Sequence, residues 1–378
     1  MDPKNLTLSM QSSSQDLSLS LHELPIEETI SSQSNAELPK ELGEQDLNIN
    51  RSENRYDFET SLGEGAYGKV WKAKDQKIGR VVALKQFKSS GMEGAWLCQS
   101  EIDRAGRLDH PGIPTIYDAG QKDGKSFFTM KYVEGKTLKQ LIQELINNNK
   151  DTHIRFPFVK RAELMIQLLR TLCDLHENNI VHRDIKPDNI LIDHNGHAYL
   201  MDWGIALDLN ESNGEGELCG TPKYMSPEQC DQGKIDGRSD LYSLSATFYE
   251  FLSLTYYGPT LKTAMAYIER IPIWEPARLD RIQHPSNRSF VPSEYRIIIH
   301  TGLQKDVHRR YRNAKEMLTA LEQIQDGGLC TVCTRTLIKK NLYRYMKALD
   351  WNPYIVVPTT LIFIIALFAA AVLLGTFL

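Results

Sequence analysis

A carboxylate, a lysine and an amide lie close together in the stretch HRDIKPDN, residues 182–189. Asp184 can accept a proton from a hydroxyl group, Lys186 can offset negative charge on a phosphoryl group, and Asn189 can ligate a metal ion. Asp202, in the stretch MDWG, adds a second hard oxygen ligand of the kind that suits Mg²⁺. Phosphoryl transfer needs little more, because positioning and charge neutralisation supply most of its catalysis.

Two further stretches could bring phosphates to these groups. GEGAYG (63–68) holds glycines that let the backbone approach a phosphate closely, although glycine-rich turns are common and weak as a signal. Lys85 ends the strand-like stretch VALK, and Glu101 lies in a helical stretch from which it could pair with Lys85. Either charge alone would more often be a surface residue.

The pattern of apolar residues predicts the elements that carry these groups. Residues 56–75 and 80–87 alternate like strands of an antiparallel sheet, whereas residues 162–179 and 314–324 have the apolar spacing of helices. Strands first and helices later indicate an α+β fold, with a small β-rich lobe followed by a larger helical lobe.

The order of the motifs resembles a eukaryotic-type (Hanks-type) serine/threonine protein kinase across residues 56–325. Glycine-rich loop, lysine, glutamate, HRD, DxG and SPE follow one another as in that family. The stretches YMSPEQ and DHPGIPTIYD are similar to bacterial membrane-bound members. The resemblance implies the two-lobed kinase fold, ATP with Mg²⁺ (Mn²⁺ as an alternative), and transfer of the γ-phosphate to serine or threonine hydroxyls of proteins.

Position by position, the resemblance also implies roles for single residues. Asp184 would be the catalytic base, Lys85 would contact the α- and β-phosphates, and Glu101 would hold Lys85. The other catalytic residues would be Lys186 and Asn189, and the metal ligands would be Asn189 and Asp202. ATP would contact Gly63, Glu64, Gly65, Gly68, Val70, Ala83, Lys85, Lys131, Val133 and Leu191, with Met130 as gatekeeper. Structural positions in the helical lobe would be filled by Glu228, Asp240 and Arg310.

Two residues depart from the family's pattern at the metal motif. Trp203 stands where phenylalanine is usual, and Ala105 stands where a larger apolar side chain is usual. A larger indole facing a smaller methyl group would conserve core volume, which cores tolerate best. We hypothesise that Trp203, His182, Ile116 and Ala105 form one regulatory stack; simple tolerance of the tryptophan is the alternative.

Glu217 is a further departure, in the stretch ELCGTPKYMSPE. It lies four residues before Thr221, which we expect to touch Asp184 and Lys186. At the position of Glu217 many family members carry a phosphorylated threonine that pairs with the arginine of HRD, here Arg183. A phosphate carries about −1.5 to −2 charges and calls for several cations, whereas one arginine can match a carboxylate. We therefore expect a loop that is active without modification, with a solvated loop charge as the alternative and Ser212 as the rival phosphorylation site.

The surroundings of Arg183 support this reading of Glu217. Leu97 and Leu207 occupy positions where related kinases often add basic groups. An apolar environment suits a single Glu–Arg pair better than a phosphate.

The C-terminal stretch is apolar without a single charge from residue 355 to residue 378. At about 1.5 Å per residue, a helix over 354–378 would span the roughly 30 Å hydrocarbon core of a bilayer. The basic segment 326–353 precedes it and predicts a cytoplasmic kinase domain, in a single-pass protein of the bacterial inner membrane. A helix within 336–351 has a basic face that could lie along anionic headgroups, with an ordinary solvated helix as the alternative.

The amino-acid composition limits what the N-terminal tail, the partners and the compartment of the protein can be. Residues 1–55 are acidic, rich in serine and glutamine and without aromatic residues before Tyr56, which predicts a disordered tail that could bind a protein partner. A net charge of −4 gives no hint of a nucleic-acid partner. The six scattered cysteines indicate a reducing compartment, and Cys330 with Cys333 form only a weak metal signal. Homodimer formation stays open, and a pseudokinase scaffold is the competing class of function.

Overall fold

The computed structural model describes residues 55–65, 67–212, 218–282, 291–325 and 358. The chain divides into two compact units, residues 1–319 and 320–378, and the first holds the site. Our predictions for residues 1–54, for 326–353 and for most of 354–378 fall outside the described residues. Within these described ranges, no helix is long and apolar enough to cross a bilayer.

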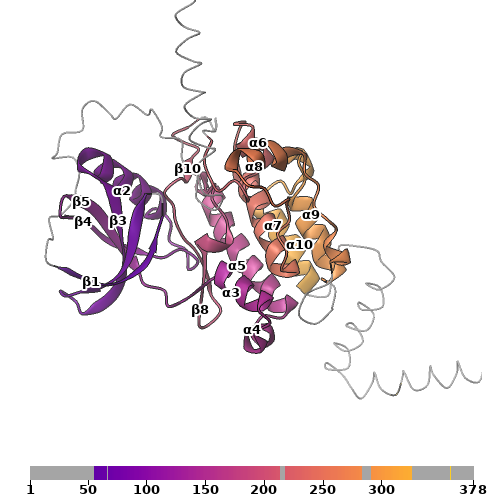
Figure 1. Ribbon diagram of the computed structural model, residues 1–378, viewed down its shortest axis with the longest axis horizontal. Coiled ribbons are helices and arrows are strands. Elements are labelled where there is room, and N and C mark those ends of the chain that lie inside the picture. The colour runs from indigo at the N-terminus through magenta and orange to yellow at the C-terminus, as the bar shows by residue number, and fades with distance from the viewer. Residues whose placement is uncertain (1–54, 66, 213–217, 283–290, 326–357, 359–378) are drawn as a thin grey trace, which may run out of the picture. The chain divides into compact units, whose positions relative to one another are not determined.

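A five-stranded antiparallel sheet forms the first lobe, in the order β1-β2-β3-β5-β4 (Figure 1). Helix α2 (Gly91–Ala105) packs against it, because Cys98 of α2 shares a buried cluster with Phe87 and Phe128 of two central strands. Sheet and helix together position Lys85 and Glu101. The strands are β1 (Tyr56–Glu64), β2 (Gly68–Asp75), β3 (Arg80–Ser90), β4 (Ile116–Lys122) and β5 (Lys125–Lys131).

The second lobe is mostly helical, so the predicted two-lobed α+β arrangement is confirmed. Its short strands frame the loops of the site: β6 (Gly135–Thr137), β7 (Ile180–Val181), β8 (Ile190–Asp193), β9 (Ala198–Leu200) and β10 (Leu207–Asp208). Its helices are α3 (Leu138–Ile146), α4 (Lys150–Arg155), α5 (Phe158–Glu177), α6 (Pro227–Cys230), α7 (Gly237–Ser253), α8 (Ala264–Arg270), α9 (Ser293–Gly302) and α10 (Ala314–Gln325). Short 3₁₀ turns are η1 (Pro187–Asn189), η2 (Ile271–Ile273), η3 (Leu279–Arg281) and η4 (Val307–Arg309).

Helix α7 is buried on nearly all sides. A helix in the middle of a large core lacks a solvent face, so its polar groups must find partners inside the protein. Ser243 donates through its hydroxyl to the carbonyl oxygen of Tyr224 at 2.8 Å, and Ser245 donates to that of Leu241 at 2.7 Å. The helix places Asp240, which has no exposed surface, against residues 182–189, which we call the catalytic loop after their expected role.

Candidate active site

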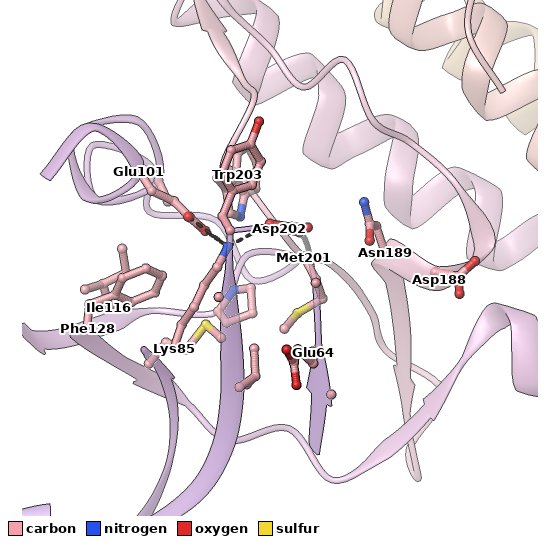
Figure 2. Close-up of a pocket in the computed structure, with 18 of the residues that line it drawn as sticks. Glu64, Lys85, Glu101, Ile116, Phe128, Asp188, Asn189, Met201, Asp202 and Trp203 are labelled. Atoms are coloured by element: carbon pink, nitrogen blue, oxygen red, sulfur yellow. Dashed lines mark hydrogen bonds and ion pairs between the residues drawn. The ribbon is translucent and has the colours of Figure 1, made fainter. Parts of the chain in front are cut away.

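Lys85 joins three elements of the chain. Its Nζ atom donates to both carboxylate oxygens of Glu101, at 2.7 and 2.8 Å, and to Oδ1 of Asp202 at 2.8 Å. Figure 2 shows this ammonium group between the two acids. Burial opposes charge on Lys85, but the neighbouring carboxylates outweigh it and raise its pKa above the ordinary value. For Asp202, enclosure also opposes charge, yet Lys85 lowers the pKa to about 2, so both groups are charged at neutral pH.

A second cluster gathers around the buried carboxylate of Asp184. Oδ1 accepts from the Thr221 hydroxyl at 2.7 Å, and Oδ2 accepts from Asn189 Nδ2 at 2.9 Å. Lys186 Nζ lies 3.1 Å from Oδ2 and donates to the Thr221 hydroxyl oxygen at 2.6 Å. Lys186, Asn189 and Thr221 therefore all contact Asp184, the expected proton acceptor.

Asp240 anchors the loop that carries this cluster. Its Oδ2 accepts from the His182 backbone N–H at 2.9 Å, and its Oδ1 accepts from that of Arg183 at 2.9 Å. Arg183 has a φ of 66°, a left-handed conformation that costs free energy for a residue with a side chain. The two charge-assisted bonds from a buried helix offset that cost and hold the loop at the cavity.

The first cluster lines one cavity of about 370 Å³, which the second cluster reaches through Lys186 and Asn189. Asp184 and Thr221 are not among the residues that line it. Adding a Cβ to Gly63 or Gly65 would meet nothing within 4 Å, so these glycines leave open space above it. At Gly68 a Cβ would lie 2.6 Å from the Gln86 carbonyl oxygen, so that glycine permits strand pairing. Predicted site residues in the walls are Gly63, Glu64, Gly65, Gly68, Val70, Lys85, Glu101, Lys186, Asn189 and Asp202.

Four residues predicted to contact the nucleotide are absent from the walls of this cavity: Ala83, Lys131, Val133 and Leu191. The Lys131 side chain is exposed and donates to the Tyr199 hydroxyl at 3.1 Å. The cavity instead extends past Met130 towards Ala105 and Ile116. The assignment of those four residues to ATP stays a prediction.

The cavity also has walls that the sequence reasoning did not assign to it: Tyr67, Pro114, Phe128, Asp188 and Met201. Four of them carried a signal. Tyr67 belongs to the stretch GEGAYG and Asp188 to the stretch HRDIKPDN. Phe128 lies two residues before Met130, so both side chains face the same side of β5. Met201 directly precedes Asp202. Pro114 reaches the cavity only through tertiary folding.

The residues of the hypothesised stack lie around the same cavity. The rings of His182 and Trp203 have centroids 4.9 Å apart in an edge-to-face arrangement. Ala105, Ile116 and Trp203 all line the cavity, and Ala105 and Trp203 are each 5% exposed. Burial lowers the pKa of His182, so its imidazole packs in the neutral form against the indole.

The segment after Asp202 corrects one expectation. Arg107, two residues after α2, donates to Asp208 at 2.9 Å, and Arg104 in the last turn of α2 donates to the Gly204 carbonyl oxygen at 3.4 Å. Burial lowers the pKa of Arg104, and the nearby charge of Arg183 lowers it further. The inference from Leu97 and Leu207, that Arg183 has an apolar environment, is therefore wrong, because α2 places the cation Arg104 near it.

The other regulatory positions are described only in part. The Nε atom of Arg183 donates to the carbonyl oxygen of Ile205 at 2.6 Å, and Ser212 is partly buried just after β10. Glu217 lies outside the described residues, as do Cys330 and Cys333. Among the residues with a described structure, no group of three or more His, Cys, Asp or Glu side chains could hold a metal ion.

Residues 56–321 match the protein kinase domain family. The chain belongs to the protein kinase family. It is 32% identical over 279 residues to the serine/threonine-protein kinase PrkC of Bacillus subtilis, covering 71% of this chain and 40% of that protein. It is 29% identical over 288 residues to the serine/threonine-protein kinase PknB of Mycolicibacterium smegmatis, covering 72% of this chain and 43% of that protein. This kinase chain thus spans about two fifths of the length of these relatives.

Proposed function

We propose that this kinase transfers the γ-phosphate of ATP to serine or threonine hydroxyl groups of proteins. The observation that carries the proposal is the shared cavity, onto which both the Lys85–Glu101–Asp202 cluster and the catalytic loop open. The first would bind phosphate oxygens, and the second would receive the hydroxyl group. The serine/threonine kinase names of the relatives support the choice of acceptor.

In the proposed reaction, the substrate hydroxyl oxygen forms a bond to the γ-phosphorus while the bond from that phosphorus to the leaving ADP oxygen breaks. Asp184 accepts the hydroxyl proton, since a carboxylate is the group in this loop that can act as a base. Lys186, within 3.1 Å of Asp184, offsets the developing phosphoryl charge.

The residues at the cavity also fit a divalent cation. Asn189 donates through Nδ2 to two oxygens of Asp184, which leaves its amide oxygen as the ligating atom. Asp202 is ionised at neutral pH and lines the same cavity. Hard oxygen donors of this kind suit Mg²⁺, or Mn²⁺ as an alternative, and the ion would neutralise phosphate charge.

Asp184→Asn tests the enzyme directly. Without a carboxylate at this position no group accepts the hydroxyl proton, so we expect phosphate transfer to a generic protein substrate to fall by about 10² to 10⁴-fold. Incorporation of phosphate from ATP measures it, with Asp151→Asn, an exposed aspartate of α4, as the matched control. A well-folded wild-type protein that transfers no phosphate would instead favour a pseudokinase scaffold.

We further propose that residues 354–378 anchor the kinase in the bacterial inner membrane, with 326–353 as a basic juxtamembrane segment and the kinase domain in the cytoplasm. The support is the uncharged apolar stretch and the basic residues before it. A signalling role, a homodimer and a protein partner for residues 1–55 are further predictions that rest on sequence alone.

A further inference from the structure

A buried glutamine in α6, Gln229, joins two backbone segments of the site. Only 1% of Gln229 is exposed. Its Nε2 group donates to the carbonyl oxygen of Arg183 at 2.9 Å and to that of Cys219 at 3.3 Å. Arg183 directly precedes Asp184, and Cys219 lies two residues before Thr221. One amide group therefore bridges the catalytic loop and the segment that carries the threonine partner of Asp184.

The other end of the same amide group is also bonded. Oε1 of Gln229 accepts from the Ser226 backbone N–H at 3.0 Å and from its hydroxyl at 3.1 Å. This is the capping box that begins α6. Rotating the amide by half a turn would place its NH₂ group against the Ser226 N–H, so the hydrogen bonds fix its orientation.

Glycine lets the two segments come this close. Gly220 has a φ of 120°, and a Cβ there would lie 2.9 Å from the Arg183 carbonyl oxygen and 3.3 Å from Gln229 Nε2. The Thr221 hydroxyl also bonds to Asp184. The segments are thus held at two points, by this side-chain bond and by the Gln229 amide.

We propose that Gln229 is a positioning residue for phosphoryl transfer, which rests on the function proposed above. Its two N–H donors keep the carbonyl oxygens of Arg183 and Cys219 at a fixed separation and so hold Asp184 against Thr221. Without them, the carbonyl oxygens of Arg183 and the buried Cys219 would lose their shared donor, and the segments would move apart to find other partners. Displacement of a reacting group by about 1 Å can lower a rate by about 10²-fold.

Two variants separate this role from helix capping. Gln229→Met keeps the length of the side chain and removes its polar atoms, whereas Ser226→Ala weakens the cap and keeps both donors. We expect kcat for a protein substrate to fall about tenfold or more in Gln229→Met, with KM for ATP within about twofold of wild type. Ser226→Ala should keep kcat within about threefold. Equal losses in both variants would overturn the proposal.

Gln229→Glu adds a readout that a purely structural role would not move. At neutral pH a carboxylate would face two carbonyl oxygens, whereas the protonated acid can donate one hydrogen bond. We expect the kcat of Gln229→Glu, relative to wild type, to rise as pH falls from about 8 to about 6, because burial favours the neutral acid. We call the two hydrogen bonds from Gln229 to the carbonyl oxygens of Arg183 and Cys219 the clamp. A ratio of kcat values that does not change with pH would count against it.

The thiol of Cys219 reports on the clamp without any catalysis. Cys219 is 4% exposed, and Cys98, with no exposed surface in the other lobe, serves as the internal control. We expect a thiol reagent to label Cys219 faster in Gln229→Met than in wild type, with the labelling of Cys98 unchanged, as read by mass spectrometry. If wild type transfers no phosphate, the proposed function fails, and the labelling rate of Cys219 alone then decides whether Gln229 holds the two segments together. An unchanged Cys219 rate overturns the clamp.

Discussion

At the scale of the residue, Trp203 shows how one substitution in a motif is absorbed by its surroundings. The indole is 5% exposed and packs edge-to-face against the neutral imidazole of His182. It lines the same cavity as Ala105, whose small side chain leaves room there. Trp203 and Ala105 therefore lie at the same cavity, as the hypothesis of volume compensation requires.

A double-mutant cycle tests that hypothesis. Trp203→Phe removes buried volume and Ala105→Leu adds it, so we expect each to lower the free energy of unfolding by about 1–3 kcal/mol. In the double variant the volumes match again, and the coupling should reach at least about 0.5 kcal/mol. Denaturant unfolding measures all four proteins. Additive single effects would show that the tryptophan is merely tolerated.

At the scale of the element, helix α2 does two things at once. It carries Glu101, which pairs with Lys85, and its last turn and the residues after it hold the segment that follows the metal motif. Arg107 forms an ion pair with the buried carboxylate of Asp208 at 2.9 Å and reaches Glu211 at 3.5 Å. Carboxylates of the chain itself therefore already meet the cation that follows α2, at the start of the segment that leads to Glu217.

We predict that this segment is active without phosphorylation. Phosphatase treatment should leave the activity unchanged, and Glu217→Ala should lower it several-fold, by about 1 kcal/mol, because the carboxylate would otherwise pair with Arg183. Glu215→Ala, which removes a neighbouring loop charge, is the matched control, and Ser212→Ala tests the rival modification site. Loss of activity after phosphatase, with Glu217→Ala unaffected, would contradict the prediction.

At the scale of the whole molecule, motifs predicted the chemistry better than they predicted the support around it. The Lys85–Glu101 pair and the Asp184–Lys186–Thr221 cluster follow from residue types that have few alternative partners in a buried site. The sequence SPEQ carries the capping-box signature of α6. The other half of the Gln229 contact lies 46 residues away along the chain at Arg183, and only tertiary packing brings it there.

The extent of the cavity could not be predicted from the sequence either. Its walls combine residues from β2, β5 and the loops of the second lobe, and local spacing does not determine how far the lobes close. The two arginines near the end of α2 were missed for the same reason. Nothing in the local sequence distinguishes Arg104, in the last turn of α2, or Arg107, just after it, and their partners follow α2 by about 100 positions.

Membrane anchoring is the prediction that concerns the whole chain. Removal of residues 354–378 should move the kinase from the membrane fraction to the supernatant, because a continuous apolar segment of this length is stable only in the bilayer. Replacing three central residues of the stretch by arginine is the matched control that keeps the chain length. Sedimentation with the membrane by the truncated protein would contradict the prediction.

The burial of α7 has a consequence for how the lobe opens. The amide hydrogens of His182 and Arg183 are bonded to a carboxylate with no exposed surface, in the helix at the centre of the lobe. These hydrogens can exchange with solvent deuterium only when Asp240 separates from the loop, which requires α7 to lose its packing. The catalytic loop therefore belongs to the same cooperative unfolding unit as the core, and its opening free energy approaches that of global unfolding.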